Sequence, residues 1–287
     1  MKKVTLKKIG LFITQLIEPY TDKKAHCHTS RRVRKGLPKL LINISNHNLE
    51  QSLSKLSIFT YQPKALTWWV AVLFMLGSLC FISASVMVSS FEDSFSGFMI
   101  NLTFFIGSVF FTSAGYAQLL EVINKDITSK DYLKVQSSTW LWWAWRPKNL
   151  GYLSSVTQLT GTILFNFNTF DAFYSGLSVL QEDIIIWVPN MLGSMLFITA
   201  SFFAWLEIYH DKHIQAFIST TWWIIWINIL GSLFFQLSAI FSYIHIDSGT
   251  YINETLLLRG TIYGAICFFV AAYLLIIEMN EKRDSSF

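Results

Sequence analysis

Six long apolar segments dominate the hydropathy pattern of the chain, and polar, charged stretches separate them. An α-helix rises about 1.5 Å per residue, so about 20 apolar residues cross a hydrocarbon core of about 30 Å. The segments are too long and too continuously apolar for the strands of a membrane barrel. We therefore predict an all-α integral membrane protein with six transmembrane helices over residues 66–90, 98–121, 152–173, 184–207, 222–244 and 254–278.

Composition supports a membrane protein and excludes several other classes. Hydrophobic residues make up 53% of the chain and charged residues 14%, whereas soluble domains contain about 25% charged residues. A disordered chain and an ordinary cytosolic enzyme are thereby excluded. Cys80 and Cys267 fall inside predicted spans and Cys27 falls in the N-terminal tail, so no disulfide framework is expected.

Basic residues give the predicted orientation. Counted against the predicted spans, all but one of the 22 Lys and Arg residues lie on the same side of the membrane. The exception is Arg259, near the start of the sixth span. Because cytoplasmic loops carry the excess of Lys and Arg, we expect both termini to lie in the cytoplasm.

The polar segments divide the chain into a tail, three hairpins and their connections. Residues 1–65 are a basic N-terminal tail, in which apolar residues within 4–17 recur at helical spacing. Two interpretations of 4–17 are open: an amphipathic helix that lies on anionic lipids, or a loosely ordered segment. The other segments are hairpins at 66–121, 152–207 and 222–278, a tryptophan-rich connection at 122–151, a second connection at 208–221, and a C-terminal tail at 279–287.

The strongest pattern in the sequence is internal repetition. Each predicted span contains a Gly, then a small residue, then a Phe four positions after the Gly. Composition alone predicts about 0.3 such matches, so one match in every span indicates a repeat. The motif glycines are Gly77, Gly107, Gly161, Gly193, Gly231 and Gly264.

The repeating unit is a pair of spans, because only the second, fourth and sixth carry a Glu fourteen residues after the motif Gly. An even number of spans per unit leaves all units in the same orientation. We therefore predict three tandem parallel hairpins around a pseudo-threefold axis along the membrane normal. Small residues let membrane helices approach closely, so the motif favours a packing face; a glycine-lined permeation path is the alternative.

Tandem two-helix units with a Gly-Ser-x-x-Phe core, as in Gly77-Ser78 to Phe81 and Gly193-Ser194 to Phe197, resemble the YrhK-like membrane domain. That bacterial family has no established activity. The resemblance covers residues 66–278 and leaves the N-terminal tail unmatched. It implies this fold and a place in the bacterial inner membrane, and it carries over no catalytic residue.

The three repeated glutamates, Glu121, Glu207 and Glu278, are the main candidates for function. Each lies at a helix C-terminus, where a negative charge opposes the helix macrodipole by about 0.3–1 kcal/mol. If the even-numbered spans turn these faces inward, the carboxylates form a ring that binds or filters cations. The alternative is that they are interfacial charges paired with Lys64, Lys148 or neighbouring cytoplasmic cations.

Polar groups inside the predicted spans form a second set of candidates, because they are costly in a bilayer. Asn166, Asn168 and Asp171 belong to the third span, and Arg259 lies at a depth similar to that of Asp171. We expect Arg259 and Asp171 to pair across the bundle. Structural hydrogen bonding between helices and a polar vestibule are both open for the group.

No enzyme signature occurs in the sequence: it has no phosphate-binding loop, dinucleotide fingerprint, HExxH or GxSxG motif. His210 and His213 match no established zinc spacing, so we expect no metal and no cofactor. No basic stripe interleaved with aromatic residues suggests nucleic-acid binding. The protein is therefore not expected to be an enzyme.

Two function classes remain. Parallel repeats and the three glutamates favour a small-solute or ion channel or carrier. Strongly apolar spans with few intramembrane charges favour a non-transporting scaffold that senses the bilayer or binds a partner. The expected contacts are the lipid bilayer, anionic lipids at the basic tail, and a membrane-protein partner or a second copy of the chain.

Overall fold

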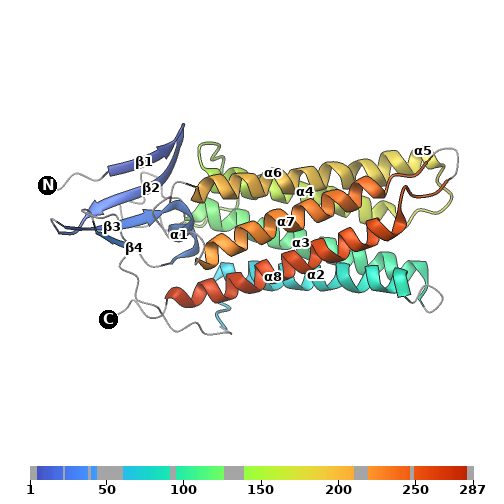
Figure 1. Ribbon diagram of the computed structural model, residues 1–287, viewed down its shortest axis with the longest axis horizontal. Coiled ribbons are helices and arrows are strands. Elements are labelled where there is room, and N and C mark those ends of the chain that lie inside the picture. Colours follow the sequence, from blue (N-terminus) through green and yellow to red (C-terminus); the bar gives the residue numbers. More distant parts are fainter. Residues whose placement is uncertain are drawn as a thin grey trace.

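The computed structural model describes residues 5–21, 23–37, 40–43, 61–90, 95–125, 139–209, 219–245 and 249–282. These residues form a small N-terminal module and a long helical bundle, and the module covers one end of the bundle (Figure 1). We call this end of the bundle the sheet end. The opposite end, where α2, α4 and α7 finish, is called the far end.

The N-terminal module is an antiparallel sheet of four strands in the order β1-β2-β3-β4. The strands are β1 (Thr5–Ile9), β2 (Phe12–Pro19), β3 (Lys24–Thr29) and β4 (Leu40–Asn43). Gly10, with φ of 52°, lies in the tight turn between β1 and β2, where a left-handed backbone favours glycine.

Neither interpretation of 4–17, an amphipathic helix or a loosely ordered segment, is therefore right, and the mostly helical fold carries a sheet that the all-α prediction lacked. Apolar pairs such as Phe12-Ile13 and Leu16-Ile17 recur four residues apart and imitate a helical stripe. Short apolar runs of this kind fit a strand equally well. Gly10 and the β-branched residues of β2 decide for the strand.

A single short helix, α1 (Ser30–Lys35), follows β3 and carries four basic residues. The Thr29 side chain accepts a hydrogen bond from the backbone N–H of Arg32 and caps its N-terminus. Gly36, with φ of 62°, ends the helix in the left-handed conformation. The Thr29 cap and the Gly36 stop confine α1 to six residues between the sheet and the bundle.

The bundle is built from six long helical segments. They are α2 (Leu66–Ser90), α3 (Gly97–Asn124), α4 (Leu150–Asp171), α6 (Val188–Ile208), α7 (Thr220–Phe241) and α8 (Glu254–Glu278). The short α5 (Val179–Glu182) and a π-helical turn, η2 (Asp183–Trp187), lead into α6 without a break, and a 3-10 turn, η4 (Met279–Lys282), follows α8.

The predicted spans agree with these helices, with small differences at their ends. The first and last spans have the predicted bounds, whereas the fifth ends at Phe241, three residues early. Ile244 instead forms an isolated β-bridge with Tyr251, which closes the turn between α7 and α8. Five helices within the described residues are long and apolar enough to cross a membrane; α4 falls short because of its polar residues.

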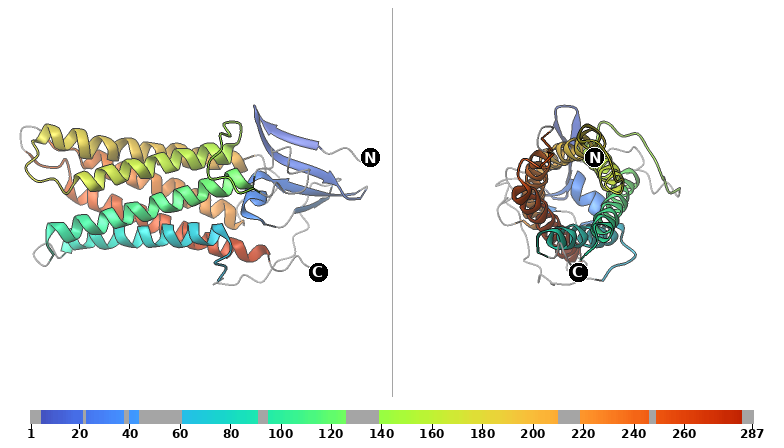
Figure 2. Two further views of the ribbon diagram at one scale, coloured as in Figure 1. Left: turned by 180° about the vertical axis from the view of Figure 1, so that it is seen from behind. Right: turned by 90° about the vertical axis from the view of Figure 1, so that its right-hand side faces the viewer.

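The six long helices close into a ring in chain order. Each packs against its two neighbours, and α8 returns to α2. Figure 2 shows the ring along its axis, with α1 visible inside its outline. The hairpins α2–α3, α4–α6 and α7–α8 each cross where their two motif glycines meet. A Cβ on Gly161 would lie 2.9 Å from the Gly193 carbonyl oxygen, so only glycine permits this approach.

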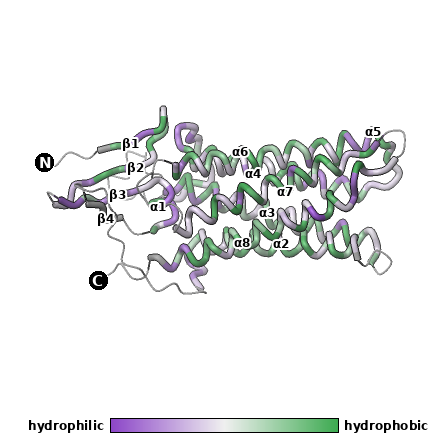
Figure 3. Tube along the Cα trace, in the orientation of Figure 1, coloured by the Kyte–Doolittle hydropathy of each residue, from purple (hydrophilic) through white to green (hydrophobic). Residues whose placement is uncertain are grey.

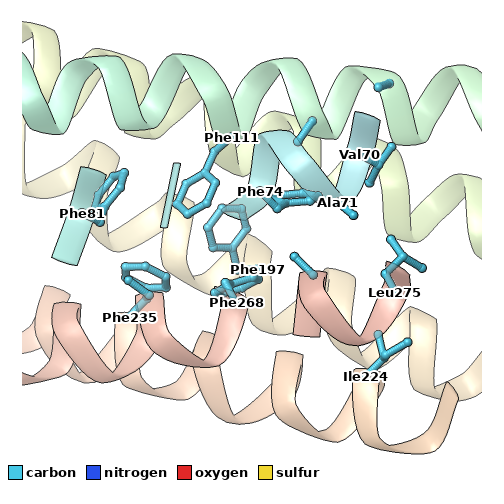
Figure 4. Packing of buried hydrophobic residues seen from close by; sticks show 14 of the residues in the cluster. Val70, Ala71, Phe74, Phe81, Phe111, Phe197, Ile224, Phe235, Phe268 and Leu275 are labelled. Atoms are coloured by element: carbon cyan, nitrogen blue, oxygen red, sulfur yellow. The ribbon is translucent and has the colours of Figure 1, made fainter. Parts of the chain in front are cut away.

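The motif phenylalanines fill the centre of the ring in two layers (Figure 4). Phe81, Phe165 and Phe235 form a triangle with ring centroids 5.9–6.4 Å apart. Each of them also contacts the motif phenylalanine of its hairpin partner, with centroids 4.9–5.5 Å apart. The second layer consists of Phe111, Phe197 and Phe268.

The outer face of the bundle is apolar along its length (Figure 3). Large hydrophobic side chains that stay 40–50% exposed include Leu79, Val109, Ile163, Met195, Leu233 and Ile266. Near the sheet end, tryptophans such as Trp69, Trp142, Trp145 and Trp223 are also exposed. Exposed apolar side chains flanked by tryptophans are typical of a lipid-facing surface, and the chain is a polytopic helical membrane protein.

Candidate functional site

The three repeated glutamates lie together at the sheet end and point inward. Each belongs to the last turns of a helix that runs back from the far end: Glu121 in α3, Glu207 in α6 and Glu278 in α8. Their exposed fractions are only 1%, 4% and 1%. The ring of three carboxylates is therefore buried within the bundle, as the first of the two interpretations of the sequence requires.

The basic side chains of α1 occupy this ring, one for each glutamate. Nη1 and Nη2 of Arg34 donate to Oε1 and Oε2 of Glu207 at 3.0 and 2.9 Å. Arg31 donates to Glu278 through Nη2 at 2.9 Å and Nε at 3.4 Å. Nζ of Lys35 donates to Oε2 of Glu121 at 2.6 Å. All three cations are buried, so α1 lies across the sheet end as a cationic plug.

Threonines at equivalent places support two of the three pairs. The Thr67 hydroxyl donates to Glu121 and the Thr221 hydroxyl donates to Glu278. Both threonines stand ten residues before a motif glycine, and in the middle hairpin that place is Gly151. A Cβ on Gly151 would lie 1.6 Å from Nη1 of Arg34. The missing side chain makes the room that the Arg34 guanidinium occupies.

Burial acts differently on the two kinds of cation in α1. Burial opposes the charged guanidinium of Arg31, but the adjacent Glu278 carboxylate outweighs it and raises the pKa of Arg31. Burial lowers the pKa of Lys35, and the Glu121 carboxylate offsets this only in part. The arginine is thus held firmly charged, and Lys35 is the pair member whose charge is easiest to lose.

Sequence reasoning found the glutamates but not their partners. Pairing with cytoplasmic cations was the second interpretation of the glutamates, but among the described residues Lys64 and Lys148 form no ion pair with them, and the cations come from the N-terminal tail. The signal was present: Arg31, Arg34 and Lys35 stand at i, i+3 and i+4, one face of a helix, between a Thr cap and a Gly stop. All three are buried, and the predicted contact of the basic tail with anionic lipids stays a prediction.

A small cavity of about 70 Å³ lies beneath α1 on the bundle axis. Arg31, Arg34 and Lys35 line it on one side, and Phe74 and Phe268 line it on the other. Its walls carry neutral polar groups from four helices: Gln118, Ser154, Gln158, Ser201 and Asn228. The cavity therefore separates the cationic plug from the phenylalanine layers.

A second cavity, of about 200 Å³, lies at the far end. Its base is the triangle of Phe81, Phe165 and Phe235, and its walls include side chains of η2 and of the turn between α7 and α8. Along the axis the order is thus α1, a small polar cavity, two layers of phenylalanine, and a larger cavity. The plug thus lies at the sheet end of the axis, and the two phenylalanine layers lie in its middle.

The other predicted polar residues are dispersed. The Asn166 side chain donates to Thr112 at 2.9 Å, and Asn168 donates to the Ile186 carbonyl at 2.9 Å beside the far-end cavity. The predicted pair of Arg259 and Asp171 is wrong: no ion pair joins them in the described residues. They belong to α8 and α4, which are not neighbours in the ring, and Arg259 is exposed.

Within the part of the chain that the structure describes, no group of three His, Cys, Asp or Glu side chains is arranged to hold a metal ion. His210 and His213 lie outside the described residues. Compared with protein-family models, curated proteins and solved structures, the chain matches none of them. The resemblance to YrhK-like membrane domains stays a prediction.

Proposed function

We propose that the chain crosses a bacterial inner membrane six times as three tandem repeats, with the sheet end in the cytoplasm. The matched Gly–Gly crossings and the closed ring support the repeat. Among the described residues, the N-terminal module, the segment before α2 and the connection between α3 and α4 carry basic residues at the sheet end, whereas Arg259 is the one Lys or Arg near the far end, which supports the orientation.

The sixth span in this proposal is α4. It has 22 residues and takes its place in the ring between α3 and α6. Its polar side chains have partners on neighbouring helices: Gln158 accepts from Gln118, and Asn166 donates to Thr112. Interhelical hydrogen bonds of this kind let a more polar helix remain in the membrane.

The function we propose is a cation channel or carrier, held closed by the N-terminal module. The observation that carries it is the inward ring of three buried glutamates, each neutralised by a cation from a segment outside the bundle. Buried ion pairs add little stability compared with apolar packing, so a bundle that only needed to fold would not require them. Without α1, the ring would present three carboxylates at the mouth of the axis and attract cations.

Replacing Gly151 with alanine tests the proposal through the plug. The new Cβ would displace the Arg34 guanidinium, the flexible end of its side chain, from Glu207. If the substitution removes about 1.4 kcal/mol from the free energy with which α1 docks on the bundle, the undocked fraction rises about tenfold. We expect monovalent-cation flux into proteoliposomes to rise accordingly over the parent protein.

The matched control is Gly115→Ala on α3, where the nearest atoms would lie 3.4 Å away in ordinary contact. Its flux should equal that of the parent. If the cation flux of Gly151→Ala is no higher than that of Gly115→Ala although Arg34 is displaced, the transport proposal fails. The alternative, a scaffold whose module is fixed to the bundle, would then be favoured by the close fit of Arg34 over Gly151.

A further inference from the structure

The described part of the wall of the far-end cavity carries acidic side chains without basic ones. Its residues include two carboxylates, Glu182 and Asp183, but no Lys, Arg or His among the described residues that line it. Asp183 is only 6% exposed and no described cation pairs with it. Its Oδ1 accepts one long hydrogen bond from the Ile244 backbone at 3.4 Å, and no described donor reaches its Oδ2. A buried carboxylate without a cation partner is costly unless a ligand supplies the charge.

The neutral polar groups of the cavity also present acceptors. Three asparagine side chains use their N–H groups on the protein: Asn101 on the Ala172 carbonyl, Asn168 on the Ile186 carbonyl and Asn190 on the Ser242 hydroxyl. No described group donates to their Oδ1 atoms, so these remain as acceptors. Carboxylates and amide oxygens together suit a positively charged ligand.

Aromatic side chains surround the same space. Phe81, Phe165 and Phe235 form its base, and Phe104, Trp187 and Tyr251 stand in its walls. The Trp187 ring is fixed, because its Nε1 donates to the Ala239 carbonyl at 2.8 Å. Aromatic faces attract organic cations, above all quaternary ammonium groups, by cation–π interaction. A strongly hydrated metal ion, by contrast, would gain little from such walls.

The π-helical turn η2 brings the charge and the aromatic wall together. Asp183 and Trp187 are its first and last residues, and the Val188 N–H bonds to the Asp183 carbonyl, one residue further back than in an α-helix. Such π-turns occur frequently at functional sites. The volume of about 200 Å³ is several times what one bound water needs, so a ligand of several heavy atoms fits.

We propose that the far-end cavity binds a small organic ammonium ion, with Asp183 as its counter-ion and Trp187, Tyr251 and the phenylalanine triangle as its aromatic walls. The binding claim stands on the cavity alone. That the bound ion is also the species conducted rests on the proposed function.

The test is equilibrium binding of choline to the purified full chain in detergent, by titration calorimetry. We expect saturable choline binding, with its neutral isostere 3,3-dimethylbutan-1-ol at least about tenfold weaker, a difference of about 1.4 kcal/mol. Asp183→Asn should weaken choline binding by at least about tenfold. The matched control is Asp171→Asn, a carboxylate on α4 that does not line the cavity and should leave binding unchanged.

A second variant keeps the proposal testable if Asp183→Asn fails to fold. Tyr251→Leu removes one exposed aromatic wall at a bridge made by backbone, and it should also weaken choline binding. Equal binding of choline and its neutral isostere overturns the proposal, as does full binding by both variants, or saturable binding of sodium but not of choline. Binding without any flux would defeat the proposed transport alone, and flux without choline binding would defeat this site alone.

Discussion

Truncating either partner of the Arg34–Glu207 pair is expected to destabilise the protein by about 3–5 kcal/mol, because the other charge stays buried without compensation. Arg34→Met leaves the carboxylate of Glu207, which is 4% exposed, without its cation. Glu207→Leu leaves the buried guanidinium of Arg34 without its carboxylate. The measurement is reversible unfolding of each variant in detergent.

The double variant, Arg34→Met with Glu207→Leu, decides whether the pair acts as a unit. Replacing both charges with apolar groups of similar volume is often neutral, so its loss of stability should be far below the sum of the single losses. Glu254→Gln, an exposed carboxylate at the start of α8, serves as the control and should cost less than about 0.5 kcal/mol. Additive losses in the double variant would mean that the two side chains do not interact.

Removing one ring from the phenylalanine triangle is expected to have the second large effect. Phe235 is 4% exposed and contacts Phe81, Phe165 and Phe268, so Phe235→Ala should cost about 3–5 kcal/mol of unfolding free energy. It should also widen the apolar constriction between the two cavities, which the proposed function takes as the barrier to ions.

The second effect is read out in proteoliposomes that carry Phe235→Ala together with Gly151→Ala, so that plug and constriction are both weakened. Cation flux should exceed that of either single variant. Phe202→Ala on α6 removes a ring of equal size from the outer face, where it is 51% exposed, and should leave flux unchanged. A double variant no leakier than Gly151→Ala alone would show that the phenylalanines are not the barrier.

Much of the bundle could be predicted from the sequence because a helix that crosses lipid needs a long apolar segment. Continuous apolar length alone determines a membrane helix, so the first and last spans have the predicted bounds. Glycine spacing then predicted where helices cross, since nothing larger than glycine fits at Gly161 or Gly193. The constant distance of Glu121, Glu207 and Glu278 to those glycines marked them as candidates, but whether they face inward was left open by the sequence.

The N-terminal module could not be predicted in the same way. Its strands are short, and the apolar pairs in β2 satisfy helical and strand spacing alike. The pairing of Arg31 and Arg34 with Glu278 and Glu207 spans 247 and 173 residues of sequence, a contact that no local pattern encodes. The predicted pair of Arg259 and Asp171 failed for the related reason that depth in the membrane says nothing of position around the ring.

Closure of the sheet end by α1 is the central claim, and the accessibility of Ser201 tests it most directly. Ser201 is 9% exposed, lines the cavity beneath α1 and contacts the Ser232 hydroxyl at 3.0 Å, so Ser201→Cys changes little else. The measurement is the rate at which a charged thiol reagent modifies this cysteine in purified protein, above the background of the native cysteines. We expect protection in the otherwise unaltered chain and rapid modification once Arg34→Met is added. Rapid modification with Arg34 in place would contradict the account, because the sheet end would then be open.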